Sequence, residues 1–357
     1  MLALPLAVVL VALSAASETD ARQTGLDRLP PTVFDVVPPS AHVRGAPGKM
    51  VVQPRACRTM PTGETRRRMV DVAVQEWGFF GFRIVDRTEV NDGDAFGNEA
   101  GDAGGAWPDL GRGGRRLSRL PPEEAARVAA SIAGYWAVTP EGSWIVERQN
   151  EEWNGPDGTA VRWNAPWSAA FVSWVMCEAG LGAASQFQRA IAHHAYIDQA
   201  IRARDGRAPQ AAFAAYDAGE TAITPGDLLC SSRRPAYRTI ADRRRQMGIG
   251  ARSHCDVVVK VDEARERILA IGGNVRGAVS LKLLRGNREP GKPLRLVDME
   301  EDRPIFAHLK LRADPIDTNA LDTSPTVKAF GCVVATRTSA FLAAANVTAL
   351  GGIAARC

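Results

Sequence analysis

The sequence predicts an α+β fold in which N-terminal helices pack on an antiparallel sheet. Up to residue 224, apolar residues recur at helical spacing, and beyond it they occur in short runs separated by polar turns, as in β-strands. Helices followed by strands, without regular alternation, favour an antiparallel sheet over a parallel α/β sheet. The 357 residues are 45% hydrophobic and 24% charged, a globular composition that excludes a wholly disordered chain.

The chain divides into four parts. Residues 1–17 read as a secretory signal peptide, because the apolar run over 2–16 is shorter than the ~20 residues of a membrane span and small residues follow it. No Lys or Arg precedes this run, so an uncleaved anchor is the alternative. Residues 18–61 are proline-rich and predict an arm or linker, 62–314 form the domain, and 315–357 form a tail. We expect a periplasmic or secreted protein with no stable membrane insertion after signal cleavage.

Local patterns predict the elements of the domain. Helical spacing predicts helices over 65–79 and 185–204, and a Pro-Pro pair followed by acidic residues opens another over 123–136. Residues 86–119 form a Gly- and Asp-rich loop, of a length that is usually functional or disordered. The predicted strands are 228–231, 254–261, 268–271, 278–284 and 305–311, with a short strand at 332–336 in the tail.

Charge and cysteine content restrict the class of partner. The formal net charge of +4 is too mild to predict a nucleic-acid binder, and the arginine runs at 66–68, 112–119 and 243–245 are expected to be solvated. Six cysteines permit many disulfide pairings, and the sequence selects none of them. No spacing suits zinc, the calcium-loop pattern beginning at Asp92 fails at its later positions, and no phosphate or dinucleotide motif occurs. We therefore expect no metal, no cofactor and no nucleic acid.

The most informative segment surrounds Ser168. Pro166 precedes it, a nearly apolar helix follows it, and Gly180 marks the end of that helix. Ser168 is expected to be the N-cap of this buried helix. The helix dipole and the free N–H groups at such a position stabilise a nearby anion. The segment thus predicts a position suited to a nucleophile as well as to a helix cap.

Polar positions on the predicted strands complete a constellation with this serine. His254 begins one strand and is the candidate base, while Asn274 ends the next strand and is a candidate to orient the imidazole. Asp256 lies two residues after His254, so their side chains share a face of the strand, and Asp256 is the alternative orienting group. Each of these residues also has a purely structural reading, as a helix cap, a strand or turn residue, or an ordinary hydrogen-bond partner.

Further residues are candidates for binding substrate. Trp163 and Trp167 flank the nucleophile position and suit stacking on sugar rings, with core packing as the alternative. His193 and His194 lie on a predicted helix that could line a cleft, and we select His194, with local pairing as the alternative. Asp227 precedes a predicted strand, where it either binds substrate or structures a turn.

Four motifs follow one another along the chain: Pro-Trp-Ser-Ala-Ala-Phe-Val-Ser-Trp-Val at 166–175, Pro-Gly-Asp-Leu at 225–228, His254 opening an apolar strand, and Gly-Gly-Asn at 272–274. Together they resemble the CHAP amidases and NlpC-type peptidases, which are papain-like cell-wall hydrolases. Over about residues 64–314 the chain also resembles a bacterial family, the domain of unknown function numbered 2272. The resemblance implies a papain-like fold, a nucleophile at the helix start, and peptidoglycan or its peptide stems as the partner.

Two positions depart from the CHAP pattern. Ser168 stands where those enzymes have a cysteine nucleophile, and Gly272 stands two residues before Asn274, where CHAP domains often have an acid. A serine hydroxyl hardly ionises near neutral pH, so it depends on an aligned base. The first hypothesis is an exported amidase or peptidase that cleaves an amide bond in peptidoglycan, with Ser168 as nucleophile and His254 as base; acyl transfer at another amide or ester suits the same residues. The alternative is a catalytically inactive papain-like module that binds wall peptides or a partner protein.

Overall fold

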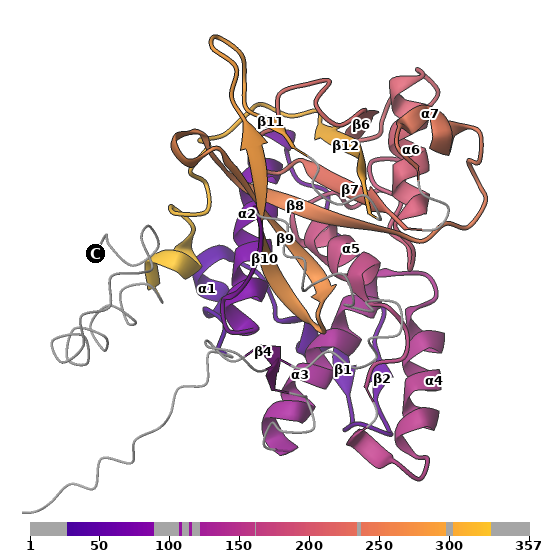
Figure 1. Cartoon of the computed structure of the whole chain (residues 1–357). Helices are drawn as coiled ribbons and strands as arrows, with labels where there is room; N and C mark the ends of the chain where they lie inside the picture. Colours follow the sequence, from indigo (N-terminus) through magenta and orange to yellow (C-terminus); the bar gives the residue numbers. More distant parts are fainter. Residues whose placement is uncertain are drawn as a thin grey trace, which may run out of the picture.

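In the computed structural model, residues 27–88, 107–108, 114–115, 122–160, 162–233, 237–297 and 303–329 are described. The fold is α+β, with an open, mostly antiparallel sheet and helices packed on it (Figure 1). Within these residues the sheet has eight strands, in the order β11-β10-β9-β8-β7-β12-β6 with β3 beside β10. They are β3 (Arg83–Arg87), β6 (Phe213–Tyr216), β7 (Leu228–Ser232), β8 (Ser253–Asp262), β9 (Arg267–Val275), β10 (Ala278–Asn287), β11 (Arg295–Leu296) and β12 (Ile305–Leu311).

The predicted antiparallel sheet is confirmed for its central strands. β7, β8, β9, β10 and β12 overlap the five strands expected in the domain, and their mutual pairings are antiparallel. The described sheet departs from the expectation in one pair, since β3 runs parallel to β10. Neither β3 nor β6 was expected. The sequence of β6 contains two alanines between Phe213 and Tyr216, and alanine has little preference for strands.

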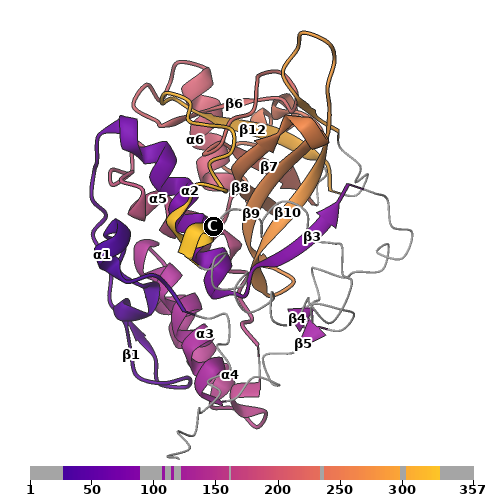
Figure 2. The same ribbon diagram turned by 90° about the vertical axis from the view of Figure 1, so that its left-hand side faces the viewer.

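Helices pack on one side of the central strands, where α2 and α5 contact β8 and β9 (Figure 2). The helices are α1 (Pro31–Phe34), α2 (Thr62–Phe79), α3 (Pro122–Tyr135), α4 (Gly142–Trp153), α5 (Ser168–Glu178), α6 (His194–Arg204) and α7 (Ile240–Arg244). Short 3-10 turns occupy η1 (Pro39–His42), η3 (Trp136–Val138), η4 (Gly158–Ala160) and η5 (Glu263–Arg265). Two small ribbons, β1 (Val43–Arg44) with β2 (Val51–Val52) and β4 (Trp107–Pro108) with β5 (Gly114–Arg115), lie outside the main sheet.

The buried helix expected after Pro166 is α5, and all of its residues are buried. It ends as the sequence predicts, with Gly180 at a φ of 93°. The N–H of Gly180 donates to the carbonyl of Cys177, and the N–H of Leu181 donates to that of Met176, which is the Schellman pattern. The predicted cap at Ser168 was wrong: Trp167 is the N-cap residue, and Ser168 is the first residue of the helix. Its hydroxyl does not cap the helix and is available for another contact.

The helix predicted over 185–204 is shorter than expected, because α6 begins only at His194. The side chain of Gln199 replaces the missing helical hydrogen bonds of the preceding segment. Its amide donates to the carbonyls of Ala184 and Ser185, and its carbonyl accepts from the N–H of Gln188 at 2.7 Å. These bonds hold the segment as a loop against α6.

The described part of the proline-rich segment packs against the helices as an arm. Val36, Met50 and Val52 belong to the main hydrophobic core, and a disulfide joins Cys57 to Cys177 on α5. Part of the predicted tail is packed as well. Leu321 is buried, and its N–H donates to the carbonyl of Val259 on β8. Both ends of the described chain therefore contribute to the domain.

Two of the arginine runs that were expected to be solvated contain buried members. Arg66 on α2 and Arg243 on α7 are each 1% exposed. Arg66 forms an ion pair with Asp227 at 2.8 Å, and Arg243 binds both oxygens of Asp198 at 2.7 Å. The guanidinium groups also donate to backbone carbonyls, so their charges and N–H donors are satisfied in the interior. The solvated reading was wrong for these two residues.

Several predicted features lie outside the described residues: the signal peptide (1–17), the short strand at 332–336, Cys332, Cys357 and most of the loop over 86–119. A second disulfide within the described chain joins Cys230 on β7 to Cys255, its direct partner on β8. The helices that the structure describes include none that is both long enough and apolar enough to cross a bilayer.

Candidate functional site

The hydroxyl of Ser168, at the first turn of α5, bonds to a histidine that the sequence reasoning did not select. Ser168 Oγ lies 2.7 Å from Nε2 of His193, the residue immediately before α6. Both residues are buried, with 8% and 4% of their surface exposed. Because α5 begins at Ser168, its first backbone N–H groups have no partner within the helix. The contact therefore places an imidazole on a serine oxygen at the N-terminal end of a buried helix.

His193 is held from its other side by Tyr196, whose phenol bonds to Nδ1. Burial, followed by the charge of His254, holds the pKa of His193 well below its ordinary value. Burial and then the charge of Asp256 raise the pKa of Tyr196 well above its ordinary value. The imidazole and the phenol are therefore both neutral near pH 7.

The bond to Tyr196 assigns the tautomer of His193. Among the described residues, His193 is the partner of the phenol, and a buried O–H requires an acceptor. The phenol therefore donates to Nδ1 of His193, and the ring proton resides on Nε2. In this tautomer Nε2 donates to Ser168 Oγ and leaves the hydroxyl proton of the serine for a different acceptor.

His254 and Asp256 form the contact that their two-residue spacing on β8 predicts. His254 Nε2 lies 2.8 Å from Asp256 Oδ1, and Lys282 on β10 holds the other carboxylate oxygen at 3.0 Å. Burial alone would raise the pKa of Asp256, but Lys282 and His254 together hold it far below its ordinary value. A carboxylate only accepts hydrogen bonds, so Nε2 of His254 carries a proton. The acceptor nitrogen of neutral His254 is therefore Nδ1.

The two histidines lie next to each other, with 5.3 Å between their ring centroids. They join two hydrogen-bonded sets, Ser168–His193–Tyr196 from α5 and α6, and His254–Asp256–Lys282 from the sheet. Within the described chain Ser168 Oγ bonds to His193 and not to His254. The structure thus brings the predicted nucleophile and base into one cluster but places His193 between them.

Gly272 and Gly273 on β9 permit this close packing. A Cβ atom at Gly272 would lie 1.9 Å from Asp256 Oδ1 and 2.9 Å from His254 Nε2. A Cβ atom at Gly273 would lie 2.5 Å from the Cβ of Phe171 on α5. The two glycines therefore let the strand approach both the helix and the carboxylate.

Asn274, the other candidate to orient the imidazole, has a different place. Its φ is 56°, in the left-handed region, and it precedes the turn between β9 and β10. In the described structure the partner of His254 Nε2 is Asp256, not Asn274. Asparagine tolerates the left-handed region better than most residues, so this backbone conformation accounts for an asparagine at position 274.

The residues predicted to bind substrate make ring contacts, ion pairs or hydrogen bonds with other parts of the protein. Trp167 is 1% exposed and stacks on Phe80 and Tyr135, and Trp163 packs edge-on against Trp153. Asp227 is fully buried between Arg66 and His308. Burial alone would raise its pKa, but His308 and Arg66 lower it. His194 accepts a 3.5 Å hydrogen bond from the N–H of Ala251.

Three residues of the cluster were not selected from the sequence: His193, Tyr196 and Lys282. His193 and Tyr196 are three residues apart, a spacing that places side chains on one side of a helix. The place of Lys282 can be predicted only from the strand register. Lys282 on β10 pairs with Ala270 on β9, and Ala270 pairs with Val258, two residues from Asp256 on β8. Among the described residues, no group of three or more His, Cys, Asp or Glu side chains is arranged to hold a metal ion.

Comparison with models of protein families finds a match over part of the chain. Residues 125–294 match the model of DUF2272, described as an uncharacterized protein conserved in bacteria. The matched segment is shorter than the resemblance over 64–314, but it contains every residue of the two hydrogen-bonded sets. No curated protein and no solved structure matches the chain. The segment that carries the candidate site thus matches a bacterial domain family of unknown function.

Proposed function

We propose that this protein is an exported, serine-type hydrolase that cleaves an amide bond in peptidoglycan, built on a papain-like fold. The observation that carries the proposal is the position of Ser168 at the start of buried helix α5, with its oxygen 2.7 Å from a neutral imidazole and a carboxylate-held histidine beside that imidazole. The motif resemblance supplies the substrate class, and the signal peptide predicted over residues 1–17 supplies the compartment. The two disulfides agree with an oxidising compartment.

In the proposed mechanism Ser168 attacks the carbonyl carbon and His254 is the general base. Asp256 fixes the proton of His254 on Nε2, so Nδ1 accepts the proton of the serine and later returns it to the leaving amine. For this step Oγ keeps its bond from His193 while its hydroxyl proton points toward Nδ1 of His254, and this second contact closes when substrate binds, since catalytic hydrogen bonds tighten in the substrate complex. A second attack, by water, then releases the acyl group and restores the serine.

In the proposed mechanism, His193 and the start of α5 stabilise the negative charge that develops during the reaction. The Nε2–H of His193 donates to Oγ and stabilises the oxygen as it loses its proton. Backbone N–H groups at the first turn of α5, near Ser168 and Ala169, bind the oxygen of the tetrahedral intermediate. Loss of one such donor costs about 10²–10³-fold in kcat in enzymes of this kind.

One observation favours the second candidate, a catalytically inactive module that binds wall peptides. The bond from Ser168 to His193, rather than to His254, separates the nucleophile from the oriented base. In that case the cluster is a recessed polar surface for binding and not a reaction centre.

Digestion of purified peptidoglycan, followed by mass spectrometry of released fragments, separates the two candidates. The wild type is compared with Ser168→Ala, His254→Ala and Ser168→Cys. Ser185→Ala is the matched control, because Ser185 is exposed and belongs to neither hydrogen-bonded set. Fragments that disappear in the first two variants and persist in the control support the hydrolase. Fragments released only by Ser168→Cys indicate an intact site without a working nucleophile, which supports the binding module.

A further inference from the structure

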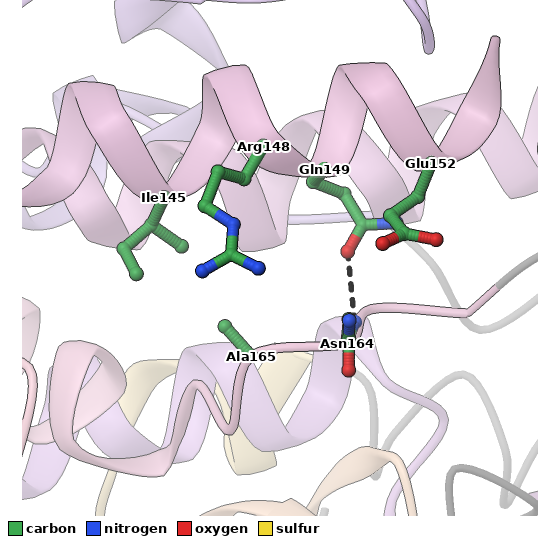
Figure 3. A pocket seen from close by; sticks show the side chains of 6 residues that line it. All are labelled: Ile145, Arg148, Gln149, Glu152, Asn164 and Ala165. Atoms are coloured by element: carbon green, nitrogen blue, oxygen red, sulfur yellow. Dashed lines mark hydrogen bonds between the residues drawn. The ribbon is translucent and has the colours of Figure 1, made fainter.

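A pocket of about 190 Å³ lies between α4 and the segment that leads into α5 (Figure 3). It is lined by Ile145, Arg148, Gln149 and Glu152 from the helix and by Asn164 and Ala165 from the facing segment. Figure 3 shows the side chains of the helix pointing across the space toward that segment. None of these residues belongs to the two hydrogen-bonded sets described above.

The base of the pocket is fixed by a buried amide. Gln149 Nε2 donates to the carbonyl of Arg162 at 3.0 Å, and Gln149 Oε1 accepts from the N–H of Asn164 at 2.8 Å. Ile145 is buried beside it. These bonds attach the segment to α4 on both sides of Trp163, so the pocket is preformed.

Two opposite charges at the pocket form no ion pair and no side-chain hydrogen bond within the described residues. Arg148 and Glu152 are exposed, and they lie one helical turn apart, a spacing at which such residues commonly pair. Here they form no ion pair with each other or with another described residue. The guanidinium of Arg148 instead lies 5.1 Å from the ring centroid of Trp144, which is 53% exposed. Both charges are therefore available to a ligand, together with the side-chain amide of exposed Asn164.

We propose that this pocket binds a short zwitterionic peptide, with its carboxylate on Arg148 and its ammonium group on Glu152. A purely anionic ligand would be repelled by Glu152, and a purely cationic one by Arg148, whereas a zwitterion satisfies both charges. A neutral sugar would leave both charges without a partner. Planar guanidinium groups suit carboxylates, because they donate two parallel hydrogen bonds.

The position of the pocket connects this ligand to the reaction, a link that rests on the proposed function. Asn164 precedes Ser168 by four residues, which span at most about 14 Å of extended chain. A short peptide anchored at Arg148 and Glu152 therefore lies within a few residues of the proposed nucleophile. The pocket would thus select wall peptides that have a free amino group and a free carboxylate.

Binding to the full chain carrying Ser168→Ala tests this proposal without any need for turnover. The probe is D-alanyl-D-alanine, compared with its N-acetylated form, which lacks the ammonium group, and its C-terminal amide, which lacks the carboxylate. Binding is followed by NMR through the indole N–H of Trp144, which lies beside Arg148. We expect saturable binding of the dipeptide and at least tenfold weaker binding of both analogues.

Variants at the exposed charges complete the test. Arg148→Gln and Glu152→Gln should each weaken binding of the dipeptide at least tenfold, while Glu151→Gln, a neighbour on the same helix that does not line the pocket, should leave it unchanged. Equal binding of the dipeptide and its analogues, equal effects of Glu151→Gln and Glu152→Gln, or no binding would overturn the proposal. Peptidoglycan cleavage by the wild type is scored separately, so a protein that cleaves without binding the dipeptide refutes the pocket, and one that binds without cleaving refutes the proposed function.

Discussion

The carboxylate of Asp256 on β8 occupies the space that a side chain at Gly272 on β9 would need. A Cβ atom at Gly272 would lie 1.9 Å from Asp256 Oδ1, far inside any allowed contact. The carboxylate of Asp256 bonds to His254 on its own strand, and the glycine on β9 makes room for it.

This relationship predicts a strong coupling between the two positions. Gly272→Ala should destabilise the protein by about 1–3 kcal/mol, because the short side chain of Asp256 is held by two bonds and cannot move away freely. Asp256→Ala removes the obstruction, so the double variant should lose less stability than the sum of the single variants. Urea unfolding of the four proteins measures the coupling, and additive losses would show that the two groups do not compete for the same space.

The tautomer assigned to His193 predicts different responses at the two histidines. His193→Gln retains an N–H donor to Ser168 Oγ and should keep most of the activity on peptidoglycan, whereas His193→Phe removes the donor and should not. His254→Ala should lower kcat/KM by about 10²–10⁴-fold, because it removes the base. If His193→Gln loses as much activity as His254→Ala, then His193 is the base and the assignment is reversed.

Asp71 on α2 predicts a dependence of stability on pH. Its burial raises its pKa to about 6, and Arg67, whose guanidinium is 3.9 Å away, offsets burial only in part. The folded protein therefore binds a proton at this group up to about pH 6, whereas the unfolded chain releases it near the ordinary value of about 4. The contribution of neutral Asp71 to the free energy of unfolding is complete below about pH 4 and is lost as the pH rises through 6.

Replacing this carboxyl by an amide should remove the dependence. Asp71→Asn should leave the free energy of unfolding almost unchanged at pH 4 and raise it at pH 7.5, by up to about 3 kcal/mol for a shift of about two pKa units. Denaturant unfolding of wild type and variant at several pH values measures the difference. A constant difference across this range would contradict the assignment.

The burial of Asp227 predicts that it acts on stability and not on the reaction. Asp227→Asn leaves the buried charge of Arg66 with an uncharged partner and weakens the hydrogen bond to His308, so it should lower the free energy of unfolding by about 3–5 kcal/mol. The rate per folded molecule should stay the same. Asp322→Asn is the control, because its ion pair with Lys260 is partly exposed and should cost about 1 kcal/mol or less. A fall in rate without a loss of stability would instead indicate that Asp227 binds substrate.

Features of local sequence could be predicted well. The end of α5 follows from Gly180 and its left-handed backbone, and the contact between His254 and Asp256 follows from the two-residue period of a strand. The central strands follow from short apolar runs between polar turns. Each of these depends on neighbours within a few residues, which is the range that a sequence pattern reports.

Features that depend on tertiary packing could not be predicted. The bond from Ser168 to His193 joins α5 to the residue before α6 and replaces the cap that the local pattern favours. The burial of Arg66 depends on carbonyls and a carboxylate that lie far along the chain. The late start of the helix predicted over 185–204 depends on Gln199, whose side chain bonds back to the loop before the helix. In each case a distant partner outweighs local propensity.

Covalent labelling of Ser168 tests the central claim, an activated serine that depends on His254. The full chain is treated with a fluorophosphonate, which reacts with activated serine hydroxyls, and the modified residue is located by peptide mass spectrometry. The account predicts a single adduct on Ser168 that is strongly reduced in His254→Ala and retained in Ser185→Ala. Absence of an adduct on Ser168, or equal labelling in His254→Ala, would contradict it.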